Sequence, residues 1–249
     1  MNNFFETNMI VKSSQCDSIS MLRPSAVLEI FQDIAEFHAL EMGISAPLLT
    51  KRDGAFWVLS KSVVRFDEGG KRIRQGESIV ARTWPLLPDG FRCHRQYAIR
   101  RSGEDAPIVS GVGEWVLVDT ETRRLRTVET TGYPLDMEHL TDIAVERPFS
   151  RMKDILSPEE KVAERVIVSS FIDLPHHTNN IVYCTLFLDT FSVAELEKMK
   201  ITSLEIHYLH ETREGDTVHI FRRAEPDGFR FSVRSADGTT AVLAYIKTE

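Results

Sequence analysis

The chain of 249 residues carries the same order of predicted elements twice, and this internal repeat limits its possible folds more than any other feature. Three local matches support the repeat: "SSQCD" at 13–17 with "SSFID" at 169–173, "RQGESIV" at 74–80 with "REGDTVH" at 213–219, and "PDGFR" at both 88–92 and 226–230. The identical pentapeptide falls in the same predicted hairpin of each half. The sequence therefore predicts a tandem duplication.

The first half predicts one long helix followed by several strands. The helix has Pro24 in its first turn and Gly43 at its end. Its apolar positions recur every three or four residues, at Val27, Ile30, Phe31, Ile34, Phe37 and Met42. Segments rich in β-branched and aromatic residues predict strands at 8–14, 56–66, 77–84, 91–100 and 111–119, with turn signals such as "DEGGK" at 67–71 between them.

The second half repeats this order. It predicts a strand at 164–170 and further strands at 202–211, 216–224, 228–236 and 239–248. The apolar run that follows Asn180 fits either a strand, because it is rich in β-branched and aromatic residues, or a helix buried on nearly every side. Its position, equivalent to that of the first helix, favours a helix that reaches Phe191.

Together these elements predict an α+β fold with two similar domains. Each half would be a long helix wrapped by a twisted antiparallel sheet, and the two sheets would pair edge to edge as a pseudo-dimer, which removes exposed edges. We place the domains at 1–131 and 163–249. The segment 132–162 between them carries prolines, mixed charges and no steady period, and predicts a connector with a short helix.

Composition excludes several classes of protein. The chain is 42% hydrophobic and 27% charged, as in soluble globular proteins, and has no apolar run long enough to cross a membrane and no signal-peptide pattern. Three cysteines at 16, 93 and 184, without paired spacing, indicate reduced thiols and a cytoplasmic protein. A net charge of −7 argues against nucleic acid as a partner. Basic clusters at 71–74 and 123–126 fit either solvated strand edges or a docking patch for an acidic partner.

The stretch "FIDLPHHTNNIVYCTLFLDTF" at 171–191 is the candidate site. When the halves are aligned on 13–17 and 169–173, His177 falls opposite Met21 and Asn179 opposite Arg23, so these polar residues occur only once. The asparagines fit a helix N-cap, and the histidines fit a solvated loop. At a helix N-terminus, however, free backbone N–H groups favour developing negative charge, which suits acyl transfer beside a histidine.

A metal site is the alternative for the same region. Its ligands would come from Asp173, His176, His177, His207, His210 and Glu211. In a strand, His207 and His210 point to opposite faces, and neither HExxH nor CxxC occurs. We therefore expect no metal and no cofactor.

With these residues identified, the chain resembles the bacterial acyl–acyl-carrier-protein thioesterases over nearly its whole length. In the first half, "FWVLSKSVVRF" and "GVGEWVLVDTETRRLRTV" carry the resemblance. In the second half, "DLPHHTNN" is similar to the family pattern D-x-N-x-H-x-N-N, and "LEIHYLHET" to L-x-x-x-Y-x-x-E-C. The resemblance implies a tandem hot-dog fold.

The resemblance also implies site residues: Asp173, His177, Asn179, Asn180 and Glu211 match the family patterns. Pro175 replaces the family's asparagine, and Thr212 stands where many plant members have cysteine, so that position offers no thiol. Cys184, inside the apolar helix, fits a buried small residue better than a nucleophile.

What remains is activation of water. Glu211, assisted by His177, would take the proton, and Asp173 would orient His177 or the water. Backbone N–H groups near Asn179 and Asn180 would hold the oxyanion. His176 would substitute for the missing asparagine. Thr212 completes the expected positioning set.

The implied substrate is a fatty acyl thioester on acyl carrier protein, an acidic partner that the arginine clusters would meet. Phe31, Phe56 and Trp57 either line an acyl pocket in the first half or belong to the core. A coenzyme A thioesterase of the same fold, a non-catalytic acyl-binding protein and a dehydratase are the rivals. A homodimer of the tandem unit is compatible with this architecture.

Overall fold

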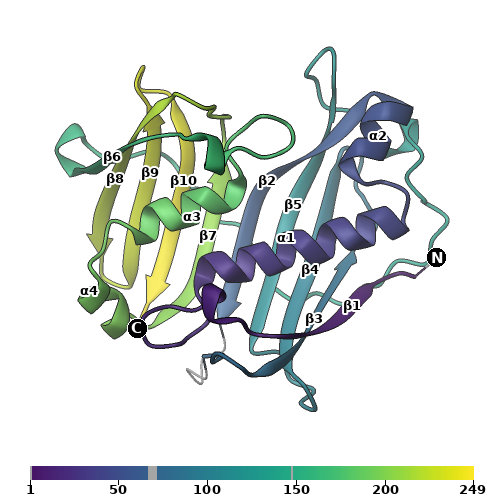
Figure 1. Cartoon of the computed structure of the whole chain (residues 1–249). Coiled ribbons are helices and arrows are strands. Elements are labelled where there is room, and N and C mark those ends of the chain that lie inside the picture. Colours follow the sequence, from purple (N-terminus) through teal and green to yellow (C-terminus); the bar gives the residue numbers. More distant parts are fainter. Residues whose placement is uncertain (1, 67–71, 147) are drawn as a thin grey trace.

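The structure, a computed structural model, describes residues 2–66, 72–146 and 148–249 (Figure 1). The predicted turn at 67–71 and Lys71 of the first basic cluster lie outside the described residues. The first half contains β1 (Phe5–Ile10), α1 (Pro24–Glu41), α2 (Ala46–Asp53), β2 (Ala55–Phe66), β3 (Ser78–Pro85), β4 (Arg92–Arg101) and β5 (Val109–Asp119). The second contains β6 (Lys161–Val166), α3 (Asn180–Leu188), α4 (Val193–Lys198), β7 (Ile201–Tyr208), β8 (Thr217–Glu225), β9 (Gly228–Ser235) and β10 (Thr240–Thr248).

All these strands form one antiparallel sheet in the order β1-β3-β4-β5-β2-β7-β10-β9-β8-β6. Counted inward from the two edges of the sheet, equivalent strands of the two halves follow in the same order. The sheet therefore has a pseudo-twofold axis between β2 and β7. These two strands pair in register from Lys61 opposite His207 to Arg65 opposite Ser203. The predicted edge-to-edge pseudo-dimer is confirmed, and the fold is a tandem hot-dog.

The long helices α1 and α3 lie on the same face of the sheet, each across the strands of its own half, and contact each other (Figure 1). Their apolar faces share one continuous core with the strands beneath them. Phe31 of α1 stacks on Tyr97 at 4.4 Å between ring centroids, directly above Gly111 of β5. A Cβ atom at Gly111 would lie 2.3 Å from the Phe31 ring, so only glycine permits this approach.

The apolar stripe predicted for α1 is correct except near its end. Phe37 is 52% exposed, whereas its neighbour His38 is fully buried. The helix therefore turns a polar side chain, not the aromatic one, toward the sheet at this position. The predicted helix of the second half is confirmed over residues 180–188, but Phe191 lies beyond its end, where it packs edge-on against Phe229.

Both first strands were predicted three residues too late. Strand β1 begins at Phe5 rather than at residue 8, and β6 begins at Lys161 rather than at residue 164. The cause is the same in each half, because the serine pairs at 13–14 and 169–170 begin short 3₁₀ turns rather than ending a strand. The short helices α2 and α4 were not predicted.

The connector crosses the face of the sheet that α1 and α3 leave open. Val145 packs on Val63 and Val112 there. Further along, the Asp154 carboxylate accepts hydrogen bonds from Ser232 and Arg234 of β9, both at 2.7 Å to Oδ2. The only helical turn among the described residues of the connector is a 3₁₀ turn at Pro158–Glu160. Both faces of the sheet are thus covered.

Candidate functional site

The loop before α3 has the same backbone as the loop before α1. The Asp173 amide donates to the His177 carbonyl at 2.9 Å, and the Asp17 amide donates to the Met21 carbonyl at 2.8 Å. Each aspartate side chain in turn accepts from the main-chain N–H of the same partner, at 3.3 Å in the second half and 2.9 Å in the first. Asp173 therefore contacts the main chain of His177, and it does so in a turn that both halves share.

The His177 imidazole lies against the Glu211 carboxylate. The distance from Nε2 to Oε2 is 2.9 Å. Glu211 reaches this position because β7 ends at Tyr208, after which the amides of Leu209 and His210 both donate to the Ala241 carbonyl. The strand end therefore supplies the change of direction that a regular strand would not allow.

Two arginines complete the polar cluster. The Arg123 Nη2 atom donates to both carboxylate oxygens of Glu211, at 2.8 and 3.0 Å. Arg213 Nη2 lies 3.3 Å from the His177 Nε2 atom and 3.7 Å from Glu211. Arg123 follows β5 in the first half, so the cluster is built from both copies. The backbone of Arg123 is left-handed, with φ 57°, and this conformation turns the residue toward the second half.

The charge state of His177 follows from these neighbours. Burial lowers the pKa of the imidazole first, Glu211 opposes that shift, and Arg213 and Arg123 lower the pKa further. The imidazole is therefore neutral near pH 7, the state in which a histidine nitrogen can accept a proton. Burial raises the pKa of Asp173 as the largest effect.

Beneath the pair, Thr212 joins the two loops. Its hydroxyl contacts the Tyr183 hydroxyl and the Thr178 hydroxyl, each at 2.7 Å, and its carbonyl accepts from the Thr178 amide. The Thr212 side chain is fully buried, so it has no surface for a substrate. It holds the Glu211 segment against the His177 segment.

The start of α3 offers main-chain donors. Asn179 is the N-cap, and its side-chain oxygen accepts from the Ile181 amide at 3.0 Å, which confirms the capping interpretation for this residue. Asn180 is the first helical residue, a position whose N–H group has no partner within the helix. Asn180 also lines an internal cavity of about 30 Å³, together with Leu28, Phe31 and Tyr208.

Two protein-family models match this chain. Residues 2–132 match the Acyl-ACP thioesterase N-terminal domain, and residues 158–248 match the Acyl-ACP thioesterase C-terminal domain. These two matches span most of the chain.

The chain belongs to the acyl-ACP thioesterase family.

Solved structures with the same fold include an acyl-ACP thioesterase from Bacteroides thetaiotaomicron, at 22% identity and a TM-score of 0.88, covering 99% of this chain and 98% of that one. The 12:0-ACP thioesterase from Umbellularia californica matches at 16% identity and 0.86, covering 100% and 98%. A putative oleoyl thioesterase from Lactobacillus plantarum matches at 15% and 0.84, covering 99% and 96%. A search of curated sequences found no match. Membership of this family makes the protein a thioester hydrolase that acts on fatty acyl thioesters.

His176, a predicted site residue, and Cys184, predicted to be buried, both lie apart from the His177–Glu211 pair. His176 is exposed and has a left-handed backbone with φ 64°, as does Ser20 with φ 62° in the equivalent turn. Within the described ranges, the His176 imidazole forms no hydrogen bond or ion pair. Cys184 is fully buried, as expected for a small residue of the core, and burial raises the pKa of its thiol to about 12, which disfavours the reactive thiolate.

The metal alternative finds no support among the residues that the structure describes, since no group of three or more His, Cys, Asp or Glu side chains could hold an ion. His207 pairs with Glu205 at 2.7 Å, and His210 contacts the Thr240 carbonyl. No helix in the described ranges is long and apolar enough to cross a membrane.

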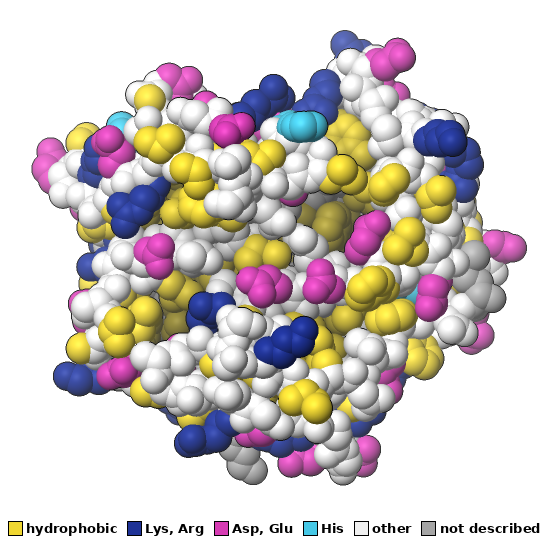
Figure 2. Space-filling model, viewed as in Figure 1, with side chains coloured by type: hydrophobic (Ala, Val, Ile, Leu, Met, Phe, Trp, Pro, Cys, Tyr) yellow, Lys and Arg dark blue, Asp and Glu magenta, His cyan; other side chains and the backbone are white. Residues whose placement is uncertain are grey.

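A second cavity, of about 110 Å³, lies next to the first in the N-terminal half. Gln32 and Trp115 line both spaces, and Trp57 and Tyr133 line the second. Hydrophobic side chains gather in a hollow on the helix-bearing face of the molecule (Figure 2). Phe31 and Trp57 thus line cavities, whereas Phe56 lies beneath the Arg123 guanidinium, 5.2 Å from its ring centroid.

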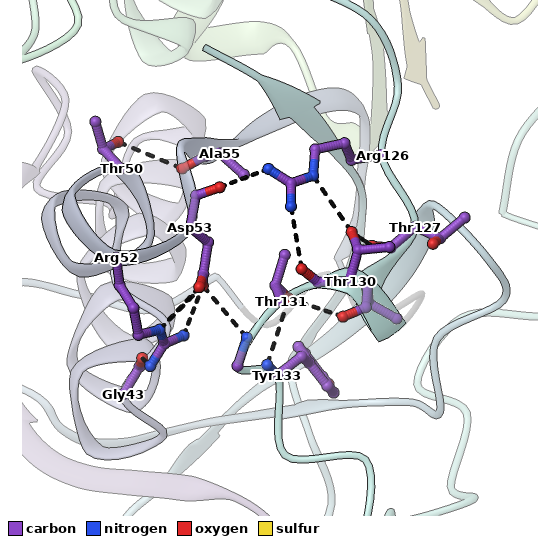
Figure 3. Close-up of polar contacts among 12 residues, drawn as sticks. Gly43, Thr50, Arg52, Asp53, Ala55, Arg126, Thr127, Thr130, Thr131 and Tyr133 are labelled. Carbon is purple, nitrogen blue, oxygen red and sulfur yellow. Dashed lines mark hydrogen bonds and ion pairs between the residues drawn. The ribbon is translucent and has the colours of Figure 1, made fainter.

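A polar network at the end of α2 holds Tyr133 in place in the wall of the second cavity (Figure 3). Asp53 pairs with Arg52 at 2.8 Å and accepts from the Gly132 amide at 3.3 Å. Arg126 bridges the Asp53 carbonyl and the Thr130 carbonyl, the latter at 3.0 Å. This network ties the start of the connector to α2 and seats Tyr133 against the cavity.

Sequence reasoning missed Arg213 and Tyr183 and treated Arg123 as part of a docking cluster. The only available signal was the "TRRL" run at 122–125, which the family resemblance already contained. Nothing in that run indicates that its first arginine reaches a carboxylate 88 positions away.

Proposed function

We propose that this thioesterase hydrolyses fatty acyl thioesters of acyl carrier protein and releases the free fatty acid, with Glu211 and His177 activating the attacking water. The observation that carries the proposal is the 2.9 Å contact between the two side chains, immediately beside the first turn of α3. An imidazole and a carboxylate in contact form the usual arrangement for general base catalysis.

The reaction needs one proton acceptor and one oxyanion site. The water oxygen attacks the thioester carbonyl while its proton passes to Glu211, assisted by His177. The tetrahedral intermediate then collapses, the carbon–sulfur bond breaks, and the thiolate takes the proton back from the pair. Arg123 keeps the Glu211 carboxylate in place through two hydrogen bonds.

The Asn180 main-chain N–H is the proposed oxyanion donor. Its position at the start of α3 adds the favourable field of the helix N-terminus to the hydrogen bond. Asn179 fixes this turn by capping it, and Asp173 fixes the main chain of His177. Thr212 holds the two loops together. For His176, which is exposed, we retain only a role at the mouth of the site.

The acyl chain occupies the cavities of the first half in this proposal, while the second half supplies the base. The two linked spaces begin at Asn180 and continue along α1 to Tyr133, and both are lined mainly by apolar side chains. The division of labour assigned to residues 1–131 and 163–249 rests on this path.

The carrier protein would approach through the arginines around the site. Arg123 is engaged with Glu211 and Arg126 with the loop at 130. Arg124 is exposed and has no ion pair among the described residues, and the Arg213 side chain is 65% exposed. These two offer charge to an acidic carrier at the rim, where such charges mainly speed association.

The test compares equivalent positions of the two halves. His177→Ala and Glu211→Gln should each lower kcat/KM for acyl–carrier thioesters by about 10²- to 10⁴-fold, the usual contribution of general acid–base groups. Met21→Ala and Arg72→Gln, the matched changes in the first half, should leave kcat/KM within about threefold of wild type. Equal losses in both halves would show that the changes act through folding.

The carrier is tested separately with the same acyl group on acyl carrier protein and on coenzyme A. We expect a higher kcat/KM for the protein carrier, reduced when Arg124 is changed to Gln. A higher kcat/KM for the coenzyme A ester, unaffected by Arg124→Gln, would assign the enzyme to the rival substrate class.

A further inference from the structure

A buried arginine lines the far end of the acyl cavity. Arg95 of β4 points to the same side of the sheet as its neighbours Cys93 and Tyr97, toward α1, and is only 6% exposed. Among the described residues that line this cavity, only Glu36 of α1 carries an acidic side chain. A guanidinium in such a place is costly unless something compensates its charge.

The contacts that Arg95 makes contain no negative charge. Its Nη1 donates to the His38 Nδ1 atom at 3.0 Å and lies 3.4 Å from the Thr83 hydroxyl. Its Nη2 approaches the Met42 sulfur at 3.9 Å, a weak contact. No carboxylate within the described ranges lies within ion-pair distance of it. By contrast, Arg234, whose side chain is more exposed at 16%, pairs with Asp154 at 2.6 Å.

His38 orients the guanidinium without neutralising it. Burial, reinforced by Arg95, lowers the pKa of the imidazole to about 4, so the ring is neutral. Its Nδ1 atom accepts from Arg95, and Nε2 therefore donates to the Asn2 carbonyl at 3.1 Å. This chain of hydrogen bonds fixes the direction of Arg95 and leaves its charge for another group.

The other titratable groups that face this end do not supply the charge. Burial raises the pKa of the Cys93 thiol and of the Tyr133 hydroxyl, which keeps both neutral. Glu36 lines the same cavity from α1, and its pKa is raised by burial and lowered in part by Arg95. Its side chain lines the cavity without forming an ion pair with Arg95.

We propose that Arg95 binds a carboxylate at the end of an aliphatic chain that fills this cavity. The proposal rests on the proposed function, because the same cavity would hold the acyl chain. The path from the site to Arg95 follows α1 from Leu28 to Ala39, a rise of about 16 Å at 1.5 Å per residue. An acyl chain whose thioester carbonyl lies at Asn180 would thus present its far end to the guanidinium.

Two sources supply this chemistry. One is an acyl substrate whose far end is itself a carboxylate, and the other is a free fatty acid, the reaction product, that enters with its carboxylate first. In either case a charge-assisted hydrogen bond forms between the guanidinium and the carboxylate. The second source would make the product an inhibitor that blocks the acyl cavity.

The substrate arm measures hydrolysis of two acyl–carrier thioesters of equal length, one ending in a methyl group and one in a carboxylate. In wild type the carboxylate-ended substrate should have the lower KM. Arg95→Met should raise that KM by about 10- to 100-fold, the size expected for one hydrogen bond to a charged group, with kcat nearly unchanged. The methyl-ended substrate should keep its KM or improve. Arg92→Met, which removes an exposed cation from the same strand, is the matched control.

The product arm needs no hydrolysis. Calorimetric titration of the purified enzyme with a long-chain fatty acid and with its methyl ester gives two dissociation constants. If the acid enters carboxylate first, Arg95→Met should weaken its binding by about 10- to 100-fold and leave the ester unchanged. Arg95→Lys, which keeps the charge, should lose less than Arg95→Met and guards against a folding defect.

The proposal would be overturned if Arg95→Met changed neither the KM of the carboxylate-ended substrate nor the affinity for the fatty acid. Hydrolysis of the methyl-ended substrate in the same experiment reports on the proposed function separately. An active enzyme with no dependence on Arg95 therefore rejects the anion site alone.

Discussion

The buried His38 predicts a specific loss of stability in acid. Its pKa is about 4 in the folded enzyme and about 6.5 in an unfolded chain, so the unfolded state takes up the proton first as pH falls. The stability contributed by the neutral imidazole is complete above pH 6.5 and is lost progressively as pH falls toward 4. Linkage gives a loss of about 2 kcal/mol between pH 7 and pH 5 from this residue alone.

The assay is urea unfolding at pH 7 and pH 5 of wild type and of His38→Gln. The glutamine side chain can still accept from Arg95 but does not titrate, and every other titrating group contributes equally to both proteins. Wild type should therefore lose about 2 kcal/mol more than His38→Gln between the two pH values. Coincident transitions by fluorescence and circular dichroism would justify the two-state analysis. Equal losses in the two proteins would refute a buried neutral His38.

Three further outcomes are expected. Cys184→Ala should keep wild-type kcat, because the buried thiol has no role in the proposed chemistry; a dead but folded variant would restore the cysteine nucleophile. The acid limb of kcat/KM should lie below about pH 6.5, since burial and the arginines lower the pKa of His177, and Arg213→Gln should move that limb upward; an unmoved limb would assign it to another group. Gly111→Ala should cost about 1 to 3 kcal/mol in urea unfolding, because its methyl group would collide with Phe31; an unchanged midpoint would show that the helix can shift.

The repeat made much of the fold predictable. Once "SSQCD" and "SSFID" are aligned, the second helix must occupy the position of the first, although its apolar residues alone fit a strand equally well. The same serine pairs also caused the shared error in β1 and β6. A serine that starts a 3₁₀ turn cannot be told from a serine that ends a strand in a single sequence. In both places its hydroxyl can form hydrogen bonds with nearby backbone groups.

The candidate site was predictable where it is local in sequence, and beyond that at Glu211, which the family resemblance supplied. His177, Asn179 and Asn180 lie in one segment, and the asparagine cap follows from the start of a helix. Arg123 contacts Glu211 from the other half, and Arg95 of β4 contacts His38 of α1. Such pairs depend on how two copies of the fold meet and on which side of a strand a residue faces, and composition carries no trace of either.

The two equivalent loops separate what belongs to the scaffold from what belongs to the chemistry. The aspartate, the left-handed residue and the exchange of main-chain hydrogen bonds occur in both halves, so the turn itself does not create a site. At the positions of His177 and Glu211, the first half has Met21 and Arg72, and Arg72 pairs with Asp17.

A cation beside that aspartate stabilises the turn but cannot take a proton from water. In the second half the equivalent position carries a carboxylate, whose charge is held by Arg123 from the neighbouring copy. The position of the proposed base, Glu211, therefore depends on the pseudo-dimer as well as on its own loop. This dependence explains why duplication, rather than a single hot-dog unit, suits a site in which an arginine of one half holds a carboxylate of the other against an imidazole.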